Sequence, residues 1–139
     1  MKKNAFTMIE LVFVIVVLGI LAAIAIPKFA ATRTDAIIAK GRSDIASIRS
    51  GIISERQSRL IQGQTSFISP ANLNNGGLFG GVLTYPMTDS TAEGHWHKVD
   101  NTTYTFKVGG ATCTFVYDQS TGKFDLNTTG NATCDKLVE

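Results

Sequence analysis

Hydrophobic and polar residues are distributed very unevenly along this chain of 139 residues. From Leu11 to Pro27 there is no charged and no strongly polar residue, whereas the C-terminal part is rich in Thr, Asn, Gly and Ser. With Phe6–Ile9 added, the apolar run approaches the roughly 20 residues that a helix needs to cross a bilayer. Lys2 and Lys3 precede the run, which favours an N-terminus on the cytoplasmic side. The pattern therefore predicts a membrane-inserted helix followed by a polar domain.

A second apolar pattern, with helical spacing, follows the first. It consists of Ile37, Gly41, Ile45, Ile48 and Ile52. Intervals of three and four residues place these positions on one face of an α-helix. Glu55 and Arg59 add a favourable pair at four residues' spacing. We predict one helix from about Phe6 to about Ile61 that stops near Gly63, with its isoleucine stripe against a sheet. Pro27 lacks an amide hydrogen and predicts a kink or local melting of the helix.

The C-terminal part alternates between apolar and polar residues, as the strands of a one-sided antiparallel sheet do. A two-residue turn at Gly109-Gly110 would bring the apolar residues of two strands onto one face. This turn pairs Val108 with Ala111, Phe106 with Cys113, and Tyr104 with Phe115. A third strand is predicted at Lys123–Asn127. The fold class is therefore α+β, a long N-terminal helix packed on a small antiparallel sheet.

The segment between helix and sheet, from Gln62 to Met87, has the composition of a loop. Its glycines lack the spacing and the terminal Lys-Ser/Thr of a phosphate-binding loop, which argues against nucleotide binding. The net charge of +2 is too small to indicate a nucleic-acid partner. The only two cysteines, Cys113 and Cys134, lack CxxC spacing. They predict one disulfide and an oxidising compartment.

Glu10 is the most informative residue of the N-terminal segment. Ala23-Ile24-Ala25 fits the cleavage site of a secretory signal, and a plain signal anchor is the second interpretation. Neither interpretation gives Glu10 a role, although an ionised carboxylate inside an apolar segment costs at least ~2.5 kcal/mol and usually has a partner and a function. A third interpretation, in which the carboxylate is functional, is therefore favoured.

The residues Ala5-Phe6-Thr7-Met8-Ile9-Glu10-Leu11, with the apolar run and Ile26-Pro27, resemble the N-terminus of type IV pilins and type II secretion pseudopilins. The resemblance implies cleavage by a prepilin peptidase between Ala5 and Phe6 and N-methylation of Phe6. Ala5 stands where the family usually has Gly. The implied organisation is a leader peptide at 1–5, a transmembrane and filament-core helix at 6–29, and a periplasmic or extracellular head at 30–139 with the pilin fold.

The resemblance also implies a mode of assembly. The carboxylate of Glu10 would pair with the amino group of Phe6 in a neighbouring copy, because two charges that are each costly in a low dielectric recover much of that cost when paired. The implied partners are copies of this chain in a helical filament, the prepilin peptidase and an inner-membrane assembly platform. The protein would lie in the inner membrane first and then in an extracellular pilus or a periplasmic pseudopilus.

We expect a structural subunit, neither an enzyme nor a cofactor-binding protein. The pair Cys113 and Cys134 resembles the disulfide-bounded C-terminal region of many type IV pilins. This favours a pilus subunit, or a minor or competence pseudopilin, over a major secretion pseudopilin. A rival from a different class is a secreted binding domain with a cleaved signal, whose binding surface would be formed by Trp96 and its flanking histidines.

Two further motifs are candidates for chemistry. His95 and His97 flank Trp96 and lie on one side of an extended segment, where they are candidate ligands for Zn²⁺ or Cu²⁺. Two imidazoles without a second pair are weak evidence, and we predict no metal site. The sequence Asp125-Leu126-Asn127-Thr128-Thr129 resembles the extended acceptor sequence of bacterial N-glycosylation, with Asn127 as the acceptor. A polar strand end would have the same composition, so both interpretations stay open.

Overall fold

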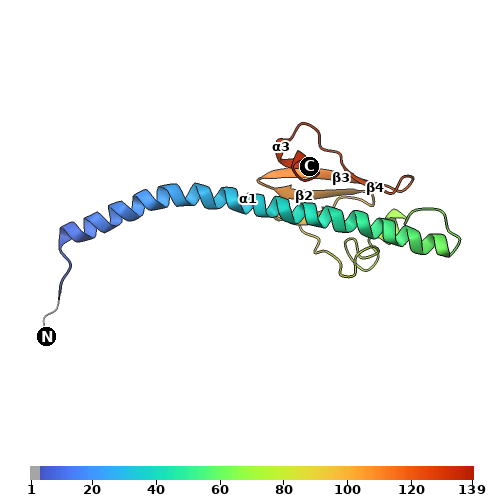
Figure 1. The fold of residues 1–139 in the computed structure, drawn as a ribbon, viewed down its shortest axis with the longest axis horizontal. Helices are drawn as coiled ribbons and strands as arrows, with labels where there is room; N and C mark the ends of the chain where they lie inside the picture. The colour runs from blue at the N-terminus through green and yellow to red at the C-terminus, as the bar shows by residue number, and fades with distance from the viewer. Residues whose placement is uncertain (1–3) are drawn as a thin grey trace. The chain divides into compact units, whose positions relative to one another are not determined.

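The computed structural model describes residues 4–139, which form two compact units, one ending at Asp35 and one from Ala36 to Glu139. The elements are α1 (Met8–Ile61), α2 (Pro70–Leu73), β1 (Trp96–Lys98), β2 (Thr103–Val108), β3 (Ala111–Asp118), β4 (Lys123–Leu126) and α3 (Ala132–Asp135) (Figure 1). Helix α1 begins in the first unit and ends in the second. We call the second unit the head and describe the two units separately.

The head contains a four-stranded sheet in the order β1-β2-β3-β4, in which all neighbouring strands are antiparallel. The predicted hairpin is confirmed residue for residue, with Val108 opposite Ala111, Phe106 opposite Cys113, and Tyr104 opposite Phe115. Gly109 and Gly110 both have positive φ, at 58° and 77°. Such a two-residue turn matches the twist of the strands and fixes their register. The predicted third strand is present as β4.

One face of α1 packs against this sheet, as the isoleucine stripe predicts. The buried residues of α1 are Ile38, Gly41, Ile45, Ile48 and Ile52. Ile37 was predicted to belong to the buried stripe but is half-buried at the edge of the core, and its neighbour Ile38 is buried instead. The helix ends at Ile61 and is followed by Gly63 with a φ of 78°, close to the predicted stop. The α+β fold class is therefore correct.

Two glycines of α1, Gly41 and Gly51, are points of close approach between the helix and the rest of the head. A Cβ at Gly41 would lie 2.7 Å from a methyl carbon of Leu137 and 2.8 Å from the ring of Phe106. A Cβ at Gly51 would overlap the carbonyl oxygen of Val82. The absence of side chains at these positions lets the sheet and the following loop pack directly on the helix backbone.

The segment 62–95 is anchored in the core by Phe79, which is fully buried and has a φ of 57°. Its ring contacts Tyr104 at a centroid distance of 4.6 Å and meets Trp96 and Phe124 edge to face. Asn74 holds this arrangement, because its side-chain amide donates to the hydroxyl of Tyr104 at 2.6 Å and its oxygen accepts from the amide of Phe79. The predicted loop is thus an ordered part of the core, with the short helix α2 inside it.

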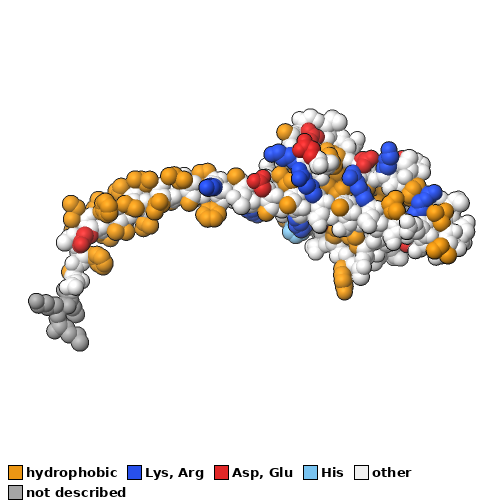
Figure 2. Space-filling view, viewed as in Figure 1, with side chains coloured by type: hydrophobic (Ala, Val, Ile, Leu, Met, Phe, Trp, Pro, Cys, Tyr) orange, Lys and Arg blue, Asp and Glu red, His pale blue; other side chains and the backbone are white. Residues whose placement is uncertain are grey.

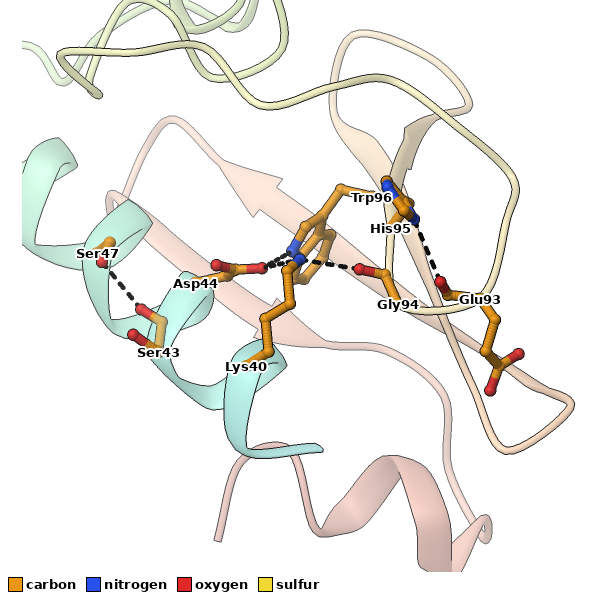
Figure 3. Close-up of polar contacts among 8 residues, drawn as sticks. All are labelled: Lys40, Ser43, Asp44, Ser47, Glu93, Gly94, His95 and Trp96. Carbon is orange, nitrogen blue, oxygen red and sulfur yellow. Dashed lines mark hydrogen bonds and ion pairs between the residues drawn. The ribbon is translucent and has the colours of Figure 1, made fainter. Parts of the chain in front are cut away.

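A polar cluster joins β1 to α1 (Figure 3). The indole N–H of Trp96 donates to Asp44 at 3.1 Å, and the ammonium of Lys40 lies 3.1 Å from the same carboxylate oxygen. Lys40 also donates to the carbonyl oxygen of Gly94 at 2.8 Å. The buried indole is therefore hydrogen-bonded, as a tryptophan in a core requires. Trp96 is the first residue of β1, in a segment for which the sequence indicated an extended conformation but no strand.

The last element, α3, is joined to the sheet by a disulfide between Cys113 of β3 and Cys134, whose Cα atoms are 5.4 Å apart. Both cysteines are fully buried. The two residues are separated by 21 positions, and closing a loop of this length contributes about 3 kcal/mol on chain-entropy grounds. The disulfide predicted from the cysteine pair is present and fixes the C-terminal segment to the core.

Candidate assembly site

Helix α1 begins with a capping box formed by Thr7 and Glu10. The backbone N–H and the hydroxyl of Thr7 both donate to one carboxylate oxygen of Glu10, at 2.8 and 2.9 Å. In return, the amide of Glu10 donates to the hydroxyl oxygen of Thr7 at 3.3 Å. Such a reciprocal pair satisfies two backbone donors that the first turn of a helix leaves free. Within a single copy, the carboxylate of Glu10 therefore has a local partner.

The first unit presents an almost continuous apolar surface (Figure 2). Its exposed large hydrophobic residues are Phe6, Met8, Ile9, Leu11, Val12, Phe13, Val14, Ile15, Val16, Val17, Leu18, Ile20, Leu21, Ile24, Ile26 and Phe29. No residue from 4 to 35 is buried. In the described residues α1 is the one helix that is long and apolar enough to span a membrane. Contiguous apolar surface of this extent marks a region that lies in lipid or against other protein.

The predicted processing residues lie at the start of this surface. Asn4 to Thr7 precede the helix and are exposed, so the Ala5-Phe6 bond is in non-helical backbone. Phe6 is 85% exposed. Pro27 lies inside α1, and the residues on both sides of it are helical. Cleavage between Ala5 and Phe6, methylation of Phe6 and a kink at Pro27 stay predictions, as do the boundaries of the leader, core helix and head.

The histidines of the head do not assemble a metal site among residues 4–139. The Nδ1 atom of His97 lies 2.7 Å from a carboxylate oxygen of Asp89, whereas Nδ1 of His95 lies against the carbonyl oxygen of Glu93. No group of three His, Cys, Asp or Glu side chains that could hold a metal ion occurs in this range. Trp96 is 1% exposed. Trp96 is therefore not available as the centre of a binding surface, and this part of the secreted-domain interpretation was wrong.

Two carboxylates of the head close turns. The backbone N–H of Thr102 donates to Asp100 and, with the neighbouring Thr103, holds the pKa of that carboxyl below its usual value. The hydroxyl of Ser120 and further donors do the same for the pKa of Asp118. Both side chains are exposed, and Asp118, the last residue of β3, begins its turn. Their shifted titration reflects local hydrogen bonding and gives no indication of an acid–base site.

Comparison with known proteins agrees with the geometry of the N-terminus. Residues 1–26 match the family model described as the prokaryotic N-terminal methylation motif. No curated protein and no solved structure matches the chain. The chain therefore carries the class III signal of type IV pilins and pseudopilins. Such a motif implies a prepilin peptidase substrate that assembles into filaments, and the long apolar helix suits insertion into the inner membrane before assembly.

Proposed function

We propose that this protein is a structural subunit of a type IV pilus or a pilus-like filament, assembled through its N-terminal helix. The observation that carries the proposal is the combination of the methylation motif with sixteen exposed large apolar side chains between Phe6 and Phe29. In a membrane these side chains contact lipid, and in a filament they contact the same region of other copies. The role is structural and involves no catalysis by this chain.

Glu10 gives the assembly its specificity. Removal of the leader after Ala5 creates a positive charge at Phe6, and N-methylation preserves that charge. The carboxylate of Glu10 then exchanges its local bonds to Thr7 for the amino group of a neighbouring copy. Both arrangements satisfy the carboxylate, so the exchange fixes the register between copies without requiring a large gain in stability. Copies of this chain, the prepilin peptidase and an inner-membrane assembly platform are the proposed partners.

Within this class, the disulfide between Cys113 and Cys134 supports a finer assignment. It closes the C-terminal part of the head. Many type IV pilins have a disulfide in this region, whereas major secretion pseudopilins generally have none. We therefore place the chain as a pilus subunit, or as a minor or competence pseudopilin. Its final location would be an extracellular fibre in the first case and a periplasmic one in the second.

The N-terminus of the mature protein tests the proposal directly. Mass spectrometry of the protein purified from the envelope of the cells that make it should give a chain beginning at N-methylated Phe6. A chain that keeps Met1, or one that begins after Ala25, would contradict the proposal. Immuno-electron microscopy with antibodies against the head separates the two finer roles, because label along long surface fibres indicates a major pilus subunit and label confined to the envelope indicates a pseudopilus.

A further inference from the structure

Three Asn-X-Thr triplets lie in the head and begin at Asn101, Asn127 and Asn131. This triplet is the acceptor sequence for N-linked glycosylation of proteins outside the cytoplasm, and it is used where it is accessible on the surface. The three triplets have the same sequence chemistry but different structural surroundings. Three features distinguish the triplets: the bonds of the asparagine side chain, the conformation of the backbone, and the residue two positions before the asparagine.

Asn131 is occupied as a helix cap. Its side-chain oxygen accepts from the backbone N–H groups of Thr133 and Cys134, at 3.0 and 3.3 Å. Cys134 is in turn fixed by the disulfide. Attachment of a sugar to this amide requires the side chain to turn away and leave the first turn of α3 uncapped. The triplet at Asn131 is therefore built into the fold.

Asn101 is exposed, and its side chain makes no hydrogen bond among residues 4–139, but its backbone lies in a closed turn. One carboxylate oxygen of the preceding residue, Asp100, accepts from the backbone N–H groups of Thr102 and Thr103, each at 2.8 Å. The carbonyl oxygen of Asn101 accepts from the hydroxyl of Tyr104, whose ring is buried. The backbone of this triplet is therefore held on both sides, and its threonine is already the first residue of β2.

Asn127 differs from Asn131 in its free side chain, and from Asn101 in the acidic residue two positions before it. It is exposed and follows directly on β4, which is an edge strand of the sheet. Its backbone N–H donates to the carbonyl oxygen of Thr114 at 2.7 Å. Across residues 4–139 no hydrogen bond involves the side chain of Asn127 or of Thr129. Residues 127–129 have no regular secondary structure, so the acceptor amide and the threonine hydroxyl are both available.

The residue two positions before Asn127 strengthens the distinction. Asp125 is exposed, and because the alternating residues Phe124 and Leu126 face the core side of β4, Asp125 and Asn127 lie on the same outer side of the strand. An acidic residue at this position completes the extended acceptor sequence and is absent before the other two triplets. Arg49 contacts Asp125 at 3.0 Å, but the two side chains are 41% and 60% exposed, and an ion pair at the surface contributes little free energy.

We propose that Asn127 is an N-glycosylation site. The donor is an oligosaccharide carried on a polyprenyl diphosphate at the outer side of the inner membrane. The side-chain nitrogen of Asn127 forms a bond to the anomeric carbon of the sugar, and the bond from that carbon to the diphosphate oxygen breaks. The amide loses one proton to a base of the transferase, and polyprenyl diphosphate leaves. The inference requires only that the head is translocated, and it is independent of filament formation.

The test is made on the mature protein purified from the cells that make it. After reduction and alkylation, cleavage at Lys123 and Lys136 gives one peptide that contains both Asn127 and Asn131. Electron-transfer fragmentation of this peptide should find a glycan mass on Asn127 and none on Asn131. The peptide that contains Asn101 should be unmodified. An unmodified Asn127, or a glycan on Asn101 or Asn131 in its place, would overturn the proposal.

Matched variants distinguish site recognition from an effect on folding. Thr129→Val and Asp125→Asn should each lose the glycan mass, whereas the corresponding change Thr133→Val in the neighbouring triplet should keep it. The disulfide between Cys113 and Cys134 should form in all three variants. A glycan on Asn127 that persists in both Thr129→Val and Asp125→Asn would show that this acceptor sequence is not what is read. Filament formation is scored separately, so failure of either proposal is recognised independently.

Discussion

Ile26 and Ile48 lie in the same helix and have the same side chain, yet Ile26 is 68% exposed and Ile48 is fully buried. The residues around Ile48 belong to a core that also contains the sheet and the ordered segment after α1. The residues around Ile26 have no such counterpart within residues 4–35. Apolar residues in the same helix therefore have two different roles in this chain. In the head it describes packing inside one copy, and in the N-terminal unit it describes a surface for lipid and other copies.

Polar groups show the same contrast. In the described part of the chain, no buried side-chain nitrogen or oxygen lacks a hydrogen-bond partner, and in the head these bonds connect distant elements, as between Trp96 and Asp44. Glu10 is different, because among residues 4–139 the hydrogen bonds of its carboxylate reach only Thr7 at the start of the helix. The bonds of the head stabilise one fold. The bonds of Glu10 are local and can be exchanged for a partner outside the copy.

The largest effect is expected from Glu10→Ala. The change removes the carboxylate that we propose to pair with the amino group of Phe6 in a neighbouring copy, so filaments should be lost or severely reduced. Insertion should be unaffected, because the costly charge is absent from the membrane. Electron microscopy of sheared fibres, with immunoblots of total subunit, measures both. Glu55→Ala changes a carboxylate of the same helix inside the head and should leave fibre number unchanged. Normal fibres from Glu10→Ala at unchanged subunit level would contradict the pairing.

The second comparison is between Ile48→Ala and Ile26→Ala. Removing a fully buried isoleucine side chain should destabilise the head by about 2–5 kcal/mol, because the core cannot close the cavity completely. Ile26→Ala should leave the stability of the head unchanged, since the side chain contributes nothing to its core. Trp96 is the only tryptophan and lies in the core, so its fluorescence during urea unfolding of the full chain in detergent reports on the head alone. Equal losses of unfolding free energy in the two variants would refute the division of the chain into an N-terminal unit and an independently packed head.

Much of this architecture could be predicted from the sequence where local chemistry determines it. The hairpin register followed from Gly109-Gly110, because a two-residue turn leaves one pairing that brings both apolar sets to one face. The continuity of α1 followed from the spacing of its isoleucines. The candidate assembly site followed from Glu10, since a carboxylate in an apolar run requires an explanation that a plain membrane anchor does not give.

The features that were missed depend on contacts between distant residues. Trp96 has polar neighbours in the sequence, and its place in the core depends on its bond to Asp44, 52 positions earlier, and on contacts with aromatic rings such as that of Phe79. Phe79 is buried with a positive φ in a glycine-rich segment, an arrangement held by Asn74 and the surrounding aromatic rings. A glycine inside a helix, such as Gly51, lowers helix propensity, and its contact with Val82 cannot be read from the sequence. None of these roles has a periodicity or a motif from which it could be read.

Glycines sharpen the comparison further. Gly51→Ala should destabilise the head by about 1–3 kcal/mol, because the new methyl group meets the backbone of Val82 and the loop must shift to admit it. Gly19 lies in the N-terminal unit and has nothing within 4 Å of the position that a Cβ would occupy. Gly19→Ala should therefore leave the urea midpoint of the head unchanged. A Gly51→Ala head as stable as the wild type would show that the contact with Val82 relaxes without cost.

The smallest effect expected is a loss of head stability at high pH. Burial raises the pKa of Tyr117 to about 12, and burial also raises the pKa of Tyr104. A phenol with a raised pKa in the folded state contributes its full stability below the unfolded value near 10, and that contribution is lost as the pH rises toward 12. The head should thus lose on the order of 1 kcal/mol between about pH 9 and about pH 11 through Tyr117.

The N-terminal unit contains no tyrosine up to Asp35, so the phenolate absorbance of the full chain reports on the head. Tyr117→Phe is the informative variant. In the wild type, the hydroxyl of Tyr117 donates to the carbonyl oxygen of Ile68 at 2.8 Å. The variant loses this bond and should be less stable at neutral pH. Its urea midpoint should nevertheless fall less steeply with pH than that of the wild type, with the remaining slope due to Tyr104. An unchanged slope in Tyr117→Phe would show that alkaline unfolding begins elsewhere, and that the buried phenol does not limit the stability of the head.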